Sequence, residues 1–236
     1  MSKTKEKKIK TKRSLWFRGL KSILRLFIKS PKFVYLGEEV EQGSLILSNH
    51  VGAKAPLAYE LYFQQPFRFW GTYEMNSNIF KVYAYLSKIY FHQKKHWNLF
   101  LARVFCIIAA PLLWLFYRGL NLISTYPDYR FKNTIKESIR TFEHNQSIVI
   151  FPEDSSKGYF DELTQCFSGF TLLGRRMLKQ DKDLSVHFAN YRKKDKTLVI
   201  SEAVKFSELM KFYPNQDNLA EMARKKINQL GKQELK

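Results

Sequence analysis

Apolar residues along the chain alternate between helical and strand-like spacing, which predicts an α/β fold. Short runs rich in β-branched and aromatic residues, bounded by Gly, Pro or polar turns, alternate with segments whose apolar residues recur at three- and four-residue steps. This alternation is typical of a mixed, largely parallel sheet with helices on both faces. Strands are predicted at 33–36, 44–47, 67–72, 147–151, 184–189 and 196–201, and helices at 54–62, 79–91, 131–143, 170–180 and 216–229.

The first 30 residues differ from the rest of the chain in charge and pattern. Residues 1–32 hold twelve Lys and Arg and a single acid, Glu6. From Ser14 to Ser30, apolar residues including Trp16 and Phe27 repeat at helical spacing with basic residues between them. We therefore divide the chain into a basic tail with an amphipathic membrane-interface helix (1–30) and an α/β domain (31–236). A helix packed on its own domain is the alternative for this segment.

A second apolar stretch lies inside the domain. Residues 104–117 carry no charge and are bracketed by Arg103 and Arg118. Crossing a bilayer takes about 20 apolar residues, and this run is shorter. We expect an apolar helical insertion at about 97–118 that dips into a membrane surface. A buried core helix fits the pattern comparably, and a full membrane span fits it less well.

The formal net charge of +19, from 40 basic and 21 acidic residues, indicates a polyanionic partner. The basic residues concentrate next to an aromatic amphipathic helix and no nucleic-acid motif is present, which favours an anionic membrane surface over nucleic acid. Cys106 and Cys166 belong to no Cys or His cluster, so no metal site is predicted and a reducing compartment is expected. These features predict a peripheral or monotopic protein on the cytoplasmic face of the cell membrane, with no indication of its oligomeric state.

Two candidate chemical loops follow predicted strands. Asn49-His50 comes after the strand at 44–47, and Pro152-Glu153-Asp154 comes after the strand at 147–151. Since catalytic loops cluster at the carboxyl ends of parallel strands, the two loops are predicted to be near neighbours. A histidine beside a carboxylate can act as a general base.

Together these loops resemble the two motifs of the glycerolipid acyltransferase family, which includes the lysophosphatidic acid acyltransferases. That family carries Asn-His-x4-Asp and, later, Phe-Pro-Glu-Gly-x-Arg-Ser, and the resemblance covers residues 33 to about 210. It implies transfer of a fatty acyl group from acyl-CoA, acyl carrier protein or acyl phosphate, without a cofactor, to a hydroxyl of a (lyso)phospholipid or related lipid acceptor. His50 would be the general base. The residues that would bind substrate are Asn49, Ser155, Ser156, Lys157 and Arg175.

The chain departs from the family pattern in both motifs. Ala55 stands where the first motif has aspartate. We hypothesise that a carboxylate of the second loop, Glu153 or Asp154, orients His50 instead, with Glu74 as a third candidate.

In the second motif Asp154 replaces glycine, Ser156 replaces arginine and Lys157 replaces serine. A serine hydroxyl does not match a guanidinium as a phosphate ligand, so Lys157, Arg175 or Arg176 would have to supply the charge. An alternative function is therefore a catalytically inactive homologue that binds lipid or membrane.

Overall fold

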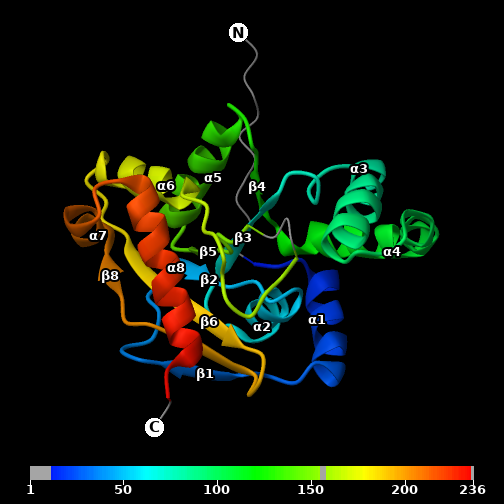
Figure 1. The fold of residues 1–236 in the computed structure, drawn as a ribbon, viewed down its shortest axis with the longest axis horizontal. Coiled ribbons are helices and arrows are strands. Elements are labelled where there is room, and N and C mark those ends of the chain that lie inside the picture. The colour runs from blue at the N-terminus through cyan, green and yellow to red at the C-terminus, as the bar shows by residue number, and fades with distance from the viewer. Residues whose placement is uncertain (1–11, 155–157, 235–236) are drawn as a thin grey trace.

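The computed structural model describes residues 12–154 and 158–234, and an eight-stranded sheet runs through it (Figure 1). Its order is β1-β7-β6-β2-β5-β3-β4, with β8 paired to β6. Strand β6 is antiparallel to β7 and β8, and the other pairs are parallel, which confirms the mixed, largely parallel α/β prediction. The strands are β1 (Lys32–Tyr35), β2 (Leu45–Ser48), β3 (Phe67–Thr72), β4 (Ile123–Thr125), β5 (Ser147–Ile150), β6 (Ser185–Arg192), β7 (Thr197–Ile200) and β8 (Val204–Lys205).

The central strands β2 and β5 are buried on both faces, because helices cover the sheet on both sides. Successive side chains of β2 point to opposite faces: Leu45 and Leu47 join one core cluster and Ile46 joins the other. The first cluster is covered by α5 (Phe131–Glu143), α6 (Gly169–Leu178), α7 (Phe206–Phe212) and α8 (Gln216–Lys232). The second is covered by α1 (Leu15–Phe27) and α2 (Lys54–Tyr62).

Helix α1 packs on the domain with one side and leaves apolar side chains on the other. Phe17 is fully buried against α4, and the buried carboxylate of Glu60 on α2 forms ion pairs with Arg13 (2.7 Å) and Lys21 (3.0 Å). Leu26 and Phe27 are each 80% exposed. The helix thus packs on its own domain, as one interpretation of the sequence expected. It also keeps an exposed apolar side, which a membrane-interface helix requires, and its contact with a membrane stays a prediction.

Three helical elements between β3 and β4 form a module with its own small core. They are α3 (Ile79–Ala84), the π-helix η1 (Tyr85–Lys94) and α4 (Leu99–Leu120), and Figure 1 shows α3 and α4 projecting to one side of the sheet. Val82, Leu86 and Cys106 are buried between them. The module begins before the predicted insertion, at Ile79.

Helix α4 is the most apolar element of this module. It has 22 residues and continues through Pro111, so by length and composition it is one helix that could cross a membrane. The argument from length against a full span was therefore wrong. Only 17% of its most apolar window is buried, so the buried-core interpretation was also wrong. Its exposed apolar side chains are Phe100, Leu101, Val104, Phe105, Ile107, Ile108, Leu112 and Leu115.

Candidate active site

The two predicted loops meet at one edge of the sheet. Strands β2 and β5 are parallel neighbours with Leu47 opposite Ile150, so the chain leaves both strands at the same edge. The ring centroids of His50 and Phe151 are 4.8 Å apart. The prediction that the two loops are neighbours is therefore confirmed, although about a hundred residues separate them in the sequence.

Asn49 fixes the end of strand β2. Its side chain is fully buried; Nδ2 donates to the Tyr191 carbonyl oxygen (3.1 Å), and Oδ1 accepts from the Tyr191 N–H (2.6 Å). The chain then turns sharply, since Val51 and Gly52 have φ angles of 45° and 65°. Both ends of the amide are used on β6, so the prediction that Asn49 binds substrate was wrong; it positions the turn that carries His50.

The imidazole of His50 is held between aromatic rings. Phe151 contacts it edge-on, and Tyr159 stacks on it with centroids 4.7 Å apart and an interplanar angle of 23°. Its Nδ1 is buried, and among the described residues no group forms a hydrogen bond with it. Burial lowers the pKa of His50 to about 4, and the positive charge of Lys94 adds to this effect. The ring is therefore neutral at physiological pH and able to accept a proton.

Glu153 lies beside the backbone of His50 rather than bonded to its ring. Burial raises the pKa of Glu153 to about 7, although the backbone N–H of His50 and the charge of Lys94 oppose the change. Its Oε1 is buried and, within the described ranges, has no hydrogen-bond partner. A carboxylate whose pKa lies near neutrality is a common feature of catalytic sites.

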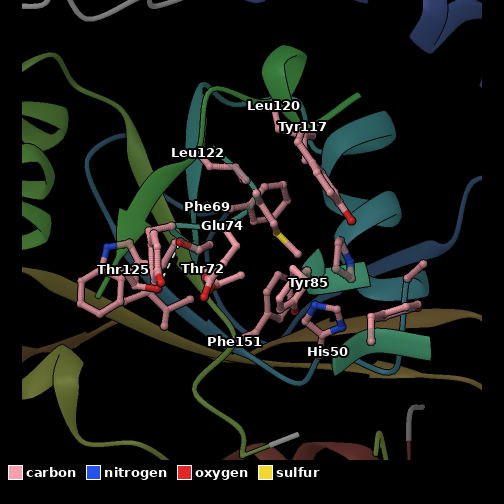
Figure 2. A pocket seen from close by; sticks show the side chains of 18 of the residues that line it. His50, Phe69, Thr72, Glu74, Tyr85, Tyr117, Leu120, Leu122, Thr125 and Phe151 are labelled. Atoms are coloured by element: carbon pink, nitrogen blue, oxygen red, sulfur yellow. Dashed lines mark hydrogen bonds between the residues drawn. The ribbon is translucent and has the colours of Figure 1, made fainter. Parts of the chain in front are cut away.

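The hypothesis that Glu153 or Asp154 orients His50, with Glu74 as a third candidate, stays a prediction: the carboxylate of Glu153 accepts a hydrogen bond from the backbone N–H of His50, but not from the ring Nδ1. Neither Glu153, Asp154 nor Glu74 bonds to that atom in this structure. Glu74 instead accepts a hydrogen bond from the Thr72 hydroxyl, and Figure 2 shows this pair in the same lining as His50. The rings of Phe151 and Tyr159 contact the imidazole, and a hydrogen bond with the Gly52 backbone raises the pKa of His50 against the larger effect of burial.

A cavity of about 1590 Å³ opens in front of His50. Pockets for small ligands usually measure about 300–1,000 Å³, so this one has room for a larger molecule. Most of its lining is apolar, and Figure 2 shows Phe69, Tyr117, Leu120 and Leu122 on its wall. Helices α1 and α4 also contribute apolar side chains: Leu20 and Leu24 from α1, with Ile28 just after it, and Leu112, Leu113, Leu115 and Phe116 from α4.

Of the remaining predicted substrate-binding residues, the structure describes Arg175. Arg175 on α6 donates from Nη2 to the Pro214 carbonyl oxygen and does not line the cavity, so its contact with substrate has no support in the cavity geometry. Arg176 lines a separate groove between α5 and α6. Ser155, Ser156 and Lys157 lie outside the described residues.

Three residues near His50 are not among those that the sequence pointed to. They are Tyr159, in the loop that follows β5, and Lys94 and Lys95, at the end of the π-helix η1. The ammonium groups of the two lysines lie 5.7 and 5.8 Å from the centroid of the Tyr159 ring. The sequence around these lysines gives little indication that they lie next to Tyr159, because residues 94 and 159 are far apart along the chain. Among residues 12–154 and 158–234, no group of three or more His, Cys, Asp or Glu could hold a metal ion.

Comparison with known proteins does not extend this description. No family model matches the chain, and no match to it was found among curated proteins. What can be said of function therefore rests on the site itself and on the residues that resemble the acyltransferase motifs.

Proposed function

We propose that this chain is a membrane-associated acyltransferase of the glycerolipid type. The observation that carries the proposal is the position of His50: a neutral imidazole at the carboxyl edge of a parallel sheet, facing a large apolar cavity. An apolar cavity of this size suits a fatty acyl chain. The acceptor would be the hydroxyl of a (lyso)phospholipid or related lipid, and the donor acyl-CoA, acyl carrier protein or acyl phosphate.

In this reaction His50 removes the proton of the acceptor hydroxyl. The alkoxide oxygen forms a bond to the acyl carbonyl carbon, the bond from that carbon to the sulfur or phosphate oxygen of the donor breaks, and the proton passes from the imidazole to the leaving group. A positioned general base contributes about 10²–10⁴-fold to such a rate. Ionised Glu153, close to the backbone of His50, would stabilise the imidazolium ion that forms in between.

The exposed faces of α1 and α4 support the membrane assignment. Leu112 and Leu115 of α4 are exposed and also line the cavity, so the cavity extends to the apolar outer surface. Contiguous apolar surfaces on a soluble domain are typical of protein or membrane contacts. With the basic residues of α1 nearby, this surface suits the anionic cytoplasmic face of a cell membrane.

A catalytically inactive, lipid-binding homologue is the second candidate. It is favoured by the His50 ring itself, whose Nδ1 lacks a bonded partner in the described structure and whose face is covered by Tyr159. In such a protein the cavity would hold a lipid without turnover.

Acyl transfer measured with His50→Ala separates the two candidates. We expect turnover with detergent-solubilised lipid acceptors, and a loss of at least about 10²-fold in His50→Ala. His144→Ala is the matched control, because His144 is exposed and its ring Nδ1 contacts the Arg140 carbonyl oxygen at the end of α5, away from the cavity lining. Turnover unchanged in His50→Ala would refute the base assignment, and no turnover with any acceptor would favour the lipid-binding homologue.

The pH dependence of the rate gives a further prediction. His50 stays neutral above about pH 5 because its pKa is about 4, so it does not change charge between pH 6 and 8. Glu153, with a pKa of about 7, ionises in that range, and kcat should rise with pH as its negative charge appears. Glu153→Gln should remove this rise. A rise that persists in Glu153→Gln would contradict the role assigned to Glu153.

A further inference from the structure

A second cavity lies between helices α5 and α6, which cover the face of the sheet opposite to α1. It measures about 600 Å³ and forms a groove where the two helices lie side by side (Figure 1). Three rows of side chains line it, and the four-residue spacing within each row places its members one above the other along a helix. The rows are Lys132, Lys136 and Arg140 on α5, Ile135, Ile139 and Glu143 on α5, and Leu172, Arg176 and Gln180 along α6 and just beyond its end.

The floor of the groove is aliphatic and reaches the solvent. Leu172 is 46% exposed, and Ile135 and Ile139 are half-buried, with their inner sides on the first core cluster. Aliphatic side chains between two neighbouring helices form a surface on which the apolar face of a third helix can pack. The floor therefore suits a helix better than an extended peptide.

Cations flank this floor on both helices. Lys132 and Lys136 are exposed on α5, and Arg176 is exposed on α6. Of the described residues that line the groove, Glu143 is the single acid, and it pairs with Lys182 outside the groove at 3.2 Å. Like charges four residues apart destabilise a helix, so the basic row of α5 is unfavourable by itself and would be stabilised by an acidic partner.

The spacing of the cations indicates the form of that partner. A helix rises about 1.5 Å per residue, so the row from Lys132 to Arg140 extends over about 12 Å. A helix packed nearly parallel or antiparallel to α5 presents its own i, i+4 and i+8 residues at the same interval. Carboxylates at those positions, next to a stripe of aliphatic residues, would match both the cations and the floor.

Other occupants match the groove less well. Among the described residues that line it there is no aromatic side chain, so nucleic acid bases would have no ring to stack on. A second copy of this chain carries the same net charge of +19 and would be repelled. The groove also lies over the first core cluster, whereas α1 covers the second, so a bilayer in contact with α1 meets the other face of the sheet.

We infer that the groove between α5 and α6 is a docking site for an acidic amphipathic helix of a partner protein. The helix would place its aliphatic stripe on the floor and its carboxylates beside Lys132, Lys136 and Arg176. Leu172 also lines the large cavity in front of His50, so the docked partner would lie directly beside that cavity. Docking requires no acyl transfer and can therefore be measured apart from the proposed function.

Binding of a designed peptide tests the docking site. The probe is a fluorescein-labelled helical peptide with leucines along one stripe and glutamates on both sides of it. It would be titrated by fluorescence anisotropy into the full chain in neutral detergent micelles. A scrambled peptide of the same composition lacks the stripe, and we expect it to bind at least about tenfold more weakly. Equal affinity for the two peptides would overturn the docking site, because it would indicate a surface that attracts any polyanion.

Charge reversal in the groove supplies the matched pair of variants. Lys136→Glu/Arg176→Glu changes one exposed cation on each helix, and the Kd of the peptide should rise at least about tenfold. Lys211→Glu/Lys226→Glu changes the net charge by the same amount, with exposed lysines of α7 and α8 that do not line the groove. This control should bind the peptide nearly as well as the unmodified chain. An equal rise of Kd in both variants would refute the site.

Crosslinking locates the peptide on the unmodified chain. A photoreactive benzophenone in the leucine stripe should attach to residues 132–143 and 172–180. Crosslinks confined to α4 or to the large cavity would place the peptide on those apolar surfaces and refute the docking site.

Liposome binding separates a protein partner from the membrane. Co-sedimentation with anionic liposomes should be the same for Lys136→Glu/Arg176→Glu and for its control. A loss confined to the groove variant would assign these cations to the membrane surface and overturn the inference.

Discussion

The partly buried carboxyl of Glu153 should make folding stability fall as the pH rises towards neutrality. Its pKa is raised to about 7 from the usual 4.5, so the folded protein favours the protonated acid. Stability associated with this group is present below about pH 4.5 and is lost as the pH rises towards about 7. Glutamine mimics the protonated acid at every pH, so Glu153→Gln should be the more stable protein at neutral and alkaline pH.

The size of this effect follows from the pKa difference. One pKa unit corresponds to about 1.36 kcal/mol, so the change from 4.5 to about 7 is equivalent to about 3 kcal/mol. By linkage, the advantage of Glu153→Gln should be close to zero at pH 4, about 1 kcal/mol at pH 5, about 2 kcal/mol at pH 6 and about 3 kcal/mol at pH 7–8. These are upper values, because the side chain of Glu153 is only partly buried and water screens part of its charge.

Urea denaturation followed by tryptophan fluorescence, at one-unit pH steps and constant ionic strength, measures this difference. The control is Glu162→Gln, in the same loop as Glu153. It removes a carboxylate that is paired with Lys232, and so it reports the effect of losing one negative charge without the shifted pKa. An advantage of Glu153→Gln that is the same at pH 4 and pH 8 would refute the reasoning. So would a loss of stability at pH 8, which would mean that the ionised carboxylate has favourable partners when folded.

Three further changes test the packing and the outer surface. Glu60→Gln should lower the free energy of unfolding by about 3 kcal/mol, because it leaves Arg13 and Lys21 without their buried counter-ion. An unchanged free energy of unfolding in urea would contradict this. Gly119→Ala should cost about 1–3 kcal/mol and speed proteolysis within α1, because the new Cβ would lie 2.0 Å from the Phe17 ring. Ile108→Glu should weaken co-sedimentation with anionic liposomes about tenfold or more, by removing an exposed apolar side chain from α4, whereas Ile108→Leu should bind normally.

Local patterns were sufficient for six of the eight strands and for their approximate ends. The predicted strand at 44–47 is β2 (Leu45–Ser48), and the buried run at 147–151 contains β5 (Ser147–Ile150). Since parallel strands end at the same edge, the positions of His50 and Glu153 followed from sequence alone. The short strands β4 and β8 and the helix α7 were missed, because segments of two to seven residues carry little periodicity.

Other features depend on contacts that no local pattern encodes. The partner of Asn49 is Tyr191, 142 residues away, so the sequence could not show that the amide is already used. The bounds of α4 (Leu99–Leu120) lie close to those of the insertion predicted at about 97–118, and an asparagine marks each end. Asn98 caps the first turn by accepting from the Phe100 N–H at 2.9 Å, and Asn121 ends the helix with a φ of 52°.

The order of strands in the sheet has a consequence for synthesis of the protein. Strand β2 pairs with β5 and β6, β1 pairs with β7, and only β3 and β4 among the first four strands pair with each other. A nascent chain that has reached residue 146 therefore already contains α1 and α4, but β2 still lacks both of its neighbours. Domains form during translation at about 5–20 residues per second, so the apolar helices emerge seconds before the sheet can close. The surface that we assign to the membrane is thus available on the ribosome before the histidine has its site.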